Sequence, residues 1–148
     1  MISPEQLRRY PYFGGISPES LKQIAMIAEE KCIPAGTELF REGDPAKHLS
    51  VITRGEVHIQ YLLGSGELRT VDTLVGGDLL GWSGIVEPYR YTAIATTTRD
   101  TELIQLDAVK LRQLLEQDPL LGYRLITQVA KLLANRLEGA RVQLAAVD

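Results

Sequence analysis

The sequence predicts a mainly β domain, an antiparallel β-barrel of the jelly-roll type with short N-terminal helices and a long C-terminal helix. Glycines and prolines divide residues 32–107 into short apolar segments, which is typical of strands joined by tight turns. The flanking segments carry apolar residues at helical spacing. A length of 148 residues favours a single domain. Within it we expect helices in 1–31, the barrel in 32–107 and helices in 108–148.

Two short helices are predicted before the barrel. Ser3 and Ser17 each precede a proline and a glutamate, and a serine hydroxyl caps a helix whose first position suits proline. The second helix is expected to extend over residues 17–30, because apolar residues recur at helical spacing up to Ala28. Aromatic residues followed by two glycines predict a turn at residues 12–15.

Four strands stand out in the barrel segment. The clearest covers residues 56–63, EVHIQYLL, where apolar and polar residues alternate. A glycine-rich hairpin loop at 64–67 leads to a second strand at 68–75. Two further strands are predicted at 91–98 and 101–107. Strands joined in this way predict a closed or sandwiched antiparallel sheet.

The last third of the chain is predicted to be helical. Asp107 is suited to cap a helix over residues 108–117, and Asp118–Pro119 interrupts it and begins a helix that continues to the end. Apolar residues in this last helix have an average period of 3.5, which indicates a coiled-coil seam and a homodimer. The predicted seam residues are Ile126, Val129, Leu133, Leu137, Ala140 and Leu144. The alternative is one wide stripe that packs only on the chain's own barrel.

Composition argues against several classes of function. The 16 basic and 19 acidic residues are interspersed, so we expect no nucleic-acid contact from this chain. A lone Cys32 excludes an internal disulfide, and we expect it to be buried as a small apolar residue. His48 and His58 form no metal-binding pattern, and no catalytic set of side chains stands at suggestive spacing. These patterns predict that the protein is not an enzyme and binds no metal. Because the sequence shows no membrane span and no signal peptide, we expect a cytoplasmic protein.

The order of motifs resembles the cyclic nucleotide-binding domain family, in particular the sensor domain of Crp/Fnr-type regulators. Residues 34–60 resemble the family's P-x-G, E-G-D and R-G-E-V run, and residues 77–85, GDLLGWSGI, resemble the opening of its phosphate-binding cassette. Residues 91–97 resemble the strand that follows, and residues 124–137 the long helix behind the barrel. The resemblance implies a pocket for a cyclic nucleotide or another small ligand.

The cassette departs from the family pattern at the residues that carry its chemistry. The resemblance implies a carboxylate after the second glycine, Gly81, to accept the ribose 2′-hydroxyl, but Trp82 stands there. It also implies an arginine before the Thr92–Ala93 pair to bind the phosphate, but Tyr91 stands there and Arg90 lies one residue earlier. In a strand, that offset places the arginine side chain on the other face. Gly84 fits the small position that follows.

Two interpretations of this pocket remain open. In one, Arg90 holds the phosphate together with the hydroxyls of Ser83 and Thr92, while Trp82 stacks on the base or covers the sugar. In the other, Trp82 and the tyrosines Tyr89 and Tyr91 fill or reshape the cavity, which then holds another ligand or none.

Ordinary nucleotide binding is the less favoured interpretation, because an unpaired phosphate and an unpaired hydroxyl would each be penalised. Arg136 lies on the last helix, where it is suited to meet an anion in the barrel, to pair with Glu87 or to face solvent.

The resemblance implies a non-catalytic regulatory sensor that signals through the dimer helix. A protein-interaction module with a degenerate pocket is the first alternative. A shortened DNA-binding regulator is the second, because regulators of this type carry a helix-turn-helix domain after the long helix and this sequence ends at Asp148. Either a trimmed chain or a free-standing sensor fits that length. A cupin-type enzyme is a more distant alternative.

Overall fold

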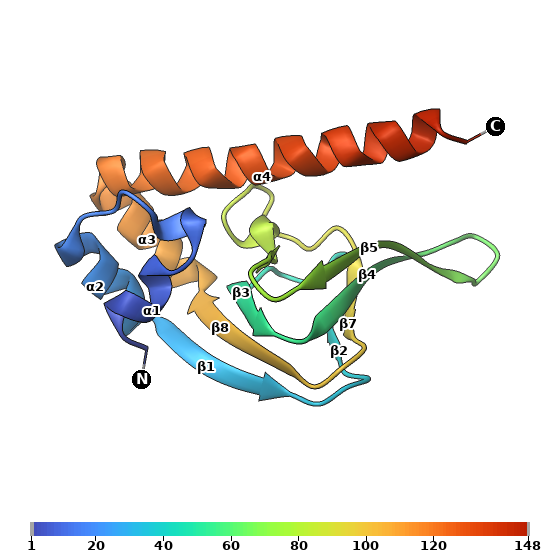
Figure 1. The fold of residues 1–148 in the computed structure, drawn as a ribbon, viewed down its shortest axis with the longest axis horizontal. Coiled ribbons are helices and arrows are strands. Elements are labelled where there is room, and N and C mark those ends of the chain that lie inside the picture. The colour runs from blue at the N-terminus through green and yellow to red at the C-terminus, as the bar shows by residue number, and fades with distance from the viewer. Residues whose placement is uncertain (1, 148) are drawn as a thin grey trace.

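Two four-stranded antiparallel sheets form the centre of the computed structural model, which describes residues 2–147 (Figure 1). The first sheet has the order β1-β8-β3-β6, and its strands are Ala28–Ile33, Thr101–Asp107, His48–Arg54 and Leu79–Leu80. The second has the order β2-β7-β4-β5, and its strands are Glu38–Phe40, Ile94–Thr97, Glu56–Leu62 and Leu68–Val75. The predicted fold class is confirmed, although the pairings within residues 2–147 form two sheets and no closed barrel.

The two sheets share an apolar core to which both contribute side chains. Ile52, Leu80 and Leu103 come from the first sheet, and they meet Val57, Leu74 and Ala95 of the second. Burial of one aliphatic side chain of this size contributes about 1.5–3 kcal/mol. The shared core therefore holds the sheets together as a sandwich.

The N-terminal helices begin where the sequence predicts. They are α1 (Pro4–Arg8), the 3-10 turn η1 (Pro11–Phe13) and α2 (Pro18–Met26). The Ser3 hydroxyl accepts a hydrogen bond from the Gln6 amide, and the Gln6 side chain accepts one from the Ser3 amide. This reciprocal arrangement is a capping box.

Two expectations for the segment after α2 are wrong. The helix ends at Met26 instead of Glu30, because residues 28–33 form β1 and pair with β8 along their whole length. Cys32 is exposed instead of buried, because β1 is an edge strand whose alternation turns this side chain outward. Helical spacing up to Ala28 could not reveal that this segment pairs with β8, which lies far along the chain.

The C-terminal helices are α3 (Ala108–Gln117) and α4 (Pro119–Ala145), and both begin at the predicted caps. Asp107 accepts from the amide of Lys110, and Asp118 accepts from the amide of Leu121. The first half of α4 packs on a second apolar core with α1, α2, α3 and the first sheet. Its end projects in the same direction as the β4–β5 hairpin (Figure 1). Within residues 2–147, no helix combines the length and apolar character that a membrane span requires.

Candidate functional site

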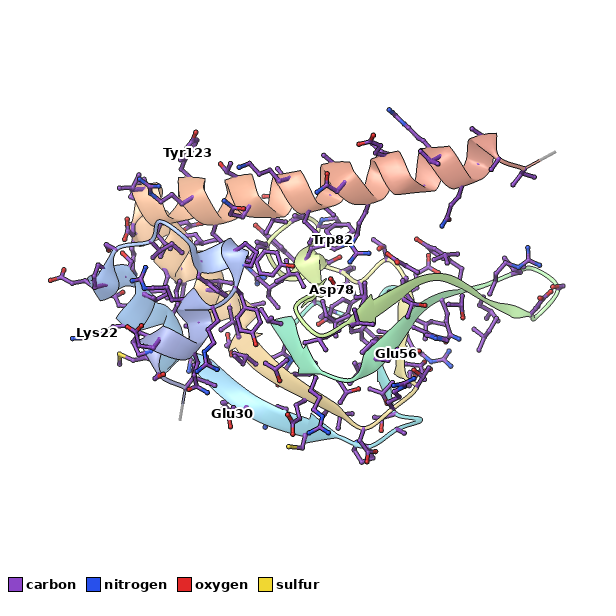
Figure 2. All side chains as sticks on the ribbon, in the orientation of Figure 1. Lys22, Glu30, Glu56, Asp78, Trp82 and Tyr123 are labelled. Atoms are coloured by element: carbon purple, nitrogen blue, oxygen red, sulfur yellow. The ribbon has the colours of Figure 1, made fainter. Side chains whose placement is uncertain are left out.

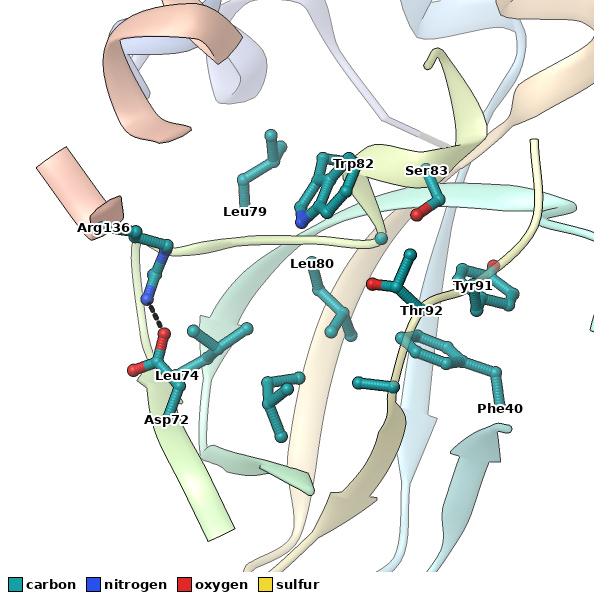
Figure 3. Close-up of a pocket in the computed structure, with 13 residues that line it drawn as sticks. Phe40, Asp72, Leu74, Leu79, Leu80, Trp82, Ser83, Tyr91, Thr92 and Arg136 are labelled. Carbon is teal, nitrogen blue, oxygen red and sulfur yellow. Dashed lines mark hydrogen bonds and ion pairs between the residues drawn. The ribbon is translucent and has the colours of Figure 1, made fainter. Parts of the chain in front are cut away.

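A cavity of about 90 Å³ lies between the two sheets and α4. It is lined by residues of β2, β4, β5 and β6, by the 3-10 turn η2 (Trp82–Gly84), by residues 91–93 and by one side chain of α4 (Figure 3). Trp82 lies beneath α4, between the helix and the sheets (Figure 2). The cavity therefore touches both the β-sandwich and the long helix.

The backbone at Gly81 holds the cassette close to β3. Its φ is 84°, in the left-handed region, and an added Cβ would lie 2.8 Å from the carbonyl oxygen of His48. Gly84 also lies in close packing, because an added Cβ would lie 3.1 Å from the Cβ of Ala108. It does not line the cavity. The absence of a side chain at both glycines thus allows η2 to pack closely against β3 and the start of α3.

Tyr91 fills the position where the resemblance implies an arginine. Its ring is stacked on Phe40, and its hydroxyl donates to the carbonyl oxygen of His48 at 3.2 Å. The side chain is buried, and this burial raises the pKa of Tyr91. The residue at this position is therefore a neutral ring that is tied to β3.

Arg90 lies outside the cavity. Its side chain is exposed, and its Nη1 donates to the carbonyl oxygen of Gly43 at 2.8 Å. Residue 90 forms an isolated antiparallel bridge with Pro45, so alternation turns its side chain away from the interior. This geometry does not support Arg90 as the phosphate-binding residue.

Arg136 is the one sequence-predicted cation that reaches the cavity. Its guanidinium forms an ion pair with Asp72 of β5 (Figure 3), and its Nη2 lies 3.9 Å from Asp78. Within residues 2–147 it makes no ion pair with Glu87, the partner considered from the sequence. The charge of Arg136 is therefore already balanced by carboxylates of the chain.

Three polar groups at the cavity have no partner within the described residues. The hydroxyls of Ser83 and Thr92 and the indole N–H of Trp82 form no hydrogen bond, whereas every fully buried side-chain polar atom there has a partner. These three groups must therefore be accessible, although Ser83 as a residue is 4% exposed. All three residues line the cavity (Figure 3).

The structure thus brings together six of the eight ligand-site residues expected from the sequence, and it leaves out Arg90 and Gly84. The six are Gly81, Trp82, Ser83, Tyr91, Thr92 and Arg136.

Sequence reasoning missed Phe40 and Asp72. Asp72 could have been noticed, because it shares a face with Leu74 in the alternation of residues 68–75, and an inward carboxylate needs a partner. Phe40 had no comparable signal.

The six expected seam residues of α4 differ in exposure. Val129 is 2% exposed and belongs to the chain's own core, so it is not available to a partner. Leu133 is half-buried against the same core. The remaining four are exposed: Ile126, Leu137, Ala140 and Leu144.

No cluster suited to metal binding occurs in the part of the chain that the structure describes. Within residues 2–147, no three histidine, cysteine, aspartate or glutamate side chains lie close enough together to hold an ion.

Comparisons with known proteins agree with the fold. The family model "Cyclic nucleotide-binding domain" matches residues 30–118. A solved protein from Geobacter metallireducens, described as a cyclic nucleotide-binding protein, superposes with a TM-score of 0.85 at 36% identity, covering 93% of this chain and 99% of that one.

Two curated regulators are also similar. The chain is 29% identical to the Cyclic AMP receptor protein of Thermus thermophilus over 90% of its own length. It is 26% identical to the CRP-like cAMP-activated global transcriptional regulator of Mycobacterium tuberculosis over 95% of its length. The chain spans 60% and 61% of the length of these two relatives.

Proposed function

The chain belongs to the cyclic nucleotide-binding domain family, and from this premise we propose that it is a non-catalytic regulatory sensor domain with an altered cassette. In this proposal the cavity does not hold a cyclic nucleotide in the family's usual way, and α4 signals to a second copy of the chain. The observation that carries the proposal is Arg136, an α4 side chain in the cavity wall that pairs with β5. An occupant of the cavity and the orientation of α4 thereby share a contact.

The size and chemistry of the cavity argue against a cyclic nucleotide. Pockets for ligands of drug size usually measure about 300–1,000 Å³, whereas this cavity measures about 90 Å³. The Phe40–Tyr91 stack occupies the place of the implied phosphate anchor, and Arg136 is balanced by Asp72. A cyclic phosphate would have to displace both arrangements.

A second copy of the chain is the partner best suited to the free face of α4. Ile126, Leu137 and Leu144 are 41%, 53% and 75% exposed, which is unfavourable for apolar side chains in water. Ala130 and Ala140 lie between them at heptad spacing. Tyr123 points away from the body of the chain near the start of the same helix (Figure 2).

Arg112 of α3 connects the cassette beside the cavity to the C-terminal helices. Its Nη1 donates to the carbonyl oxygen of Gly84 at 2.6 Å, and its guanidinium lies 4.0 Å from the ring centre of Tyr89. Because α3 is followed directly by α4 at Asp118, a shift of η2 would move α3 and reorient α4.

Sedimentation at micromolar concentration tests the dimer. We expect the wild-type chain to form dimers and Leu137→Glu to dissociate them, because a buried charge without a partner is costly. Val109→Glu is the matched control, since Val109 is 51% exposed on α3, away from the seam. A wild-type monomer, or a dimer that Leu137→Glu leaves intact, would reject the proposal.

A protein-interaction module with a degenerate pocket is a second candidate, favoured by the Phe40–Tyr91 stack that occupies the cavity wall. It requires that no small molecule bind the cavity and that substitutions lining the cavity leave partner binding unchanged.

A further inference from the structure

Building on the proposed sensor function, we infer that the cavity binds a small uncharged molecule, no larger than about one ring, that carries one hydrogen-bonding group. Asp72 is the specificity-determining residue in this inference. It forms an ion pair with Arg136, so the guanidinium is not available to bind an anionic ligand in the cavity.

Shape and lining set the size and the apolar character of the ligand. An apolar cavity of about 150 Å³ accepts benzene in another protein, so a cavity of about 90 Å³ that is partly open fits a single ring at most. Its wall is mainly apolar, with Phe40, Ile59, Leu74, Leu80 and Ala93 among the lining residues. A ligand that fits must therefore bury mostly carbon.

Unpaired polar groups at the cavity set the polar character of the ligand. Ser83 is 4% exposed but its hydroxyl has no partner within residues 2–147, and the Thr92 hydroxyl and the Trp82 indole N–H are also free there. A ligand hydroxyl or carbonyl that meets one of these groups would satisfy a donor that the protein itself leaves unpaired, which favours binding. The ligand therefore needs one hydrogen-bonding group on a mainly apolar frame.

Charge selects against anions. Among the described residues, Asp72 and Arg136 are the only acidic and basic side chains that line the cavity, and they are paired with each other. Asp78 lies next to this pair, with its Oδ2 3.9 Å from Arg136, and adds negative charge. An anionic ligand would compete with Asp72 for the guanidinium and be repelled by both carboxylates.

Benzyl alcohol and benzoate test this inference, because they share a ring and differ in charge. Trp82 is the only tryptophan in the chain, so its emission reports on the cavity, and ligand-observed NMR provides a second readout. For the wild-type chain we expect benzyl alcohol to bind at least about tenfold more tightly than benzoate, a difference of about 1.4 kcal/mol.

Asp72→Asn frees Arg136 while it keeps the shape of the side chain, so benzoate should bind about tenfold more tightly than to the wild type. Arg136→Gln, added to Asp72→Asn, should abolish this gain. Glu67→Gln is the matched control. It also removes one negative charge, but at an exposed position in the loop of the β4–β5 hairpin, the hairpin that contains Asp72. Melting curves for each variant verify that it is folded.

The outcomes separate the ligand class from the sensor function. If benzoate binds the wild-type chain as tightly as benzyl alcohol, or if Asp72→Asn does not favour benzoate, the inferred ligand class is wrong but a ligand sensor remains. If neither compound binds, the inference is rejected. Sedimentation of Leu137→Glu then decides separately whether the proposed dimer stands.

Discussion

The ring of Tyr91 lies flat on the ring of Phe40, with centroids 3.6 Å apart and planes 6° from parallel. The Tyr91 hydroxyl also accepts from the amide of His48 at 3.3 Å and donates to its carbonyl oxygen. Tyr91 therefore packs on β2 of the second sheet through Phe40 and is hydrogen-bonded to β3 of the first sheet. The side chain at the implied arginine position has a packing role.

Substitutions of Tyr91 separate the contribution of the ring from that of the hydroxyl. Tyr91→Phe keeps the stack and loses the bonds to His48, so we expect a loss of about 1 kcal/mol in the free energy of unfolding. Tyr91→Ala also leaves a cavity and should cost about 3 kcal/mol. Urea unfolding measures both values, and equal costs for the two variants would contradict the packing role of the ring.

Gly81→Ala tests whether the cassette glycine is required by close packing. Its φ of 84° and the 2.8 Å approach of an added Cβ to the His48 oxygen both disfavour alanine. Gly36→Ala is the matched control, because Gly36 has a φ of 82° with nothing near its added Cβ. The control should lose about 1–2 kcal/mol, and Gly81→Ala should lose clearly more in the same unfolding measurement. Equal losses would mean that contact with His48 is unimportant.

Arg112→Ala tests the connection between the cassette and α3. It removes a bond to the Gly84 carbonyl and a cation–π contact with Tyr89, so the chain should lose about 1–2 kcal/mol of stability. Hydrogen exchange should become faster mainly in residues 82–89. Lys110→Ala, an exposed neighbour on the same helix, serves as the control. Unchanged exchange in residues 82–89 would show that Arg112 does not hold η2.

The junction of α3 and α4 should respond to acid. The hydroxyl of Ser20 donates to the Asp118 carboxylate at 2.5 Å, which, with the Leu121 amide, lowers the pKa of Asp118. Because this pKa lies below that of the unfolded chain, about 3.9, the stabilisation is present above that pH. It is lost as pH falls through the folded value.

Ser20→Ala should therefore reduce the loss of stability between about pH 5 and pH 3, measured by urea unfolding at several pH values. Ser65→Ala removes a hydroxyl from the exposed hairpin loop and should behave as the wild type does. A Ser20→Ala chain with the wild-type pH dependence would contradict the assigned cause.

Local signals were sufficient for most of the fold. Ser3, Ser17, Asp107 and Asp118 mark helix starts because a short polar side chain caps the free amides of the first turn wherever the rest of the chain lies. The end of α2 could not be predicted in this way. Residues 28–33 are compatible with helix or strand, and pairing with distant β8 decides between them.

The candidate site was only partly predictable for the same reason. Trp82, Ser83 and Tyr91 belong to one continuous motif, so their proximity follows from the chain itself. Phe40 and Asp72 come from β2 and β5, and their positions at the cavity depend on the register of the second sheet. The ion pair between Asp72 and Arg136 could not be predicted from the sequence, because it depends on how β5 and α4 are placed in three dimensions.

Titration of the wild-type chain with cyclic AMP and cyclic GMP, followed by calorimetry and Trp82 emission, tests the central claim most directly. The claim is that the family's fold is retained while Trp82, Tyr91 and the Asp72–Arg136 pair exclude a cyclic phosphate. We expect no saturable heat and no change in emission up to millimolar nucleotide. Saturable binding of either nucleotide at micromolar concentration would contradict it.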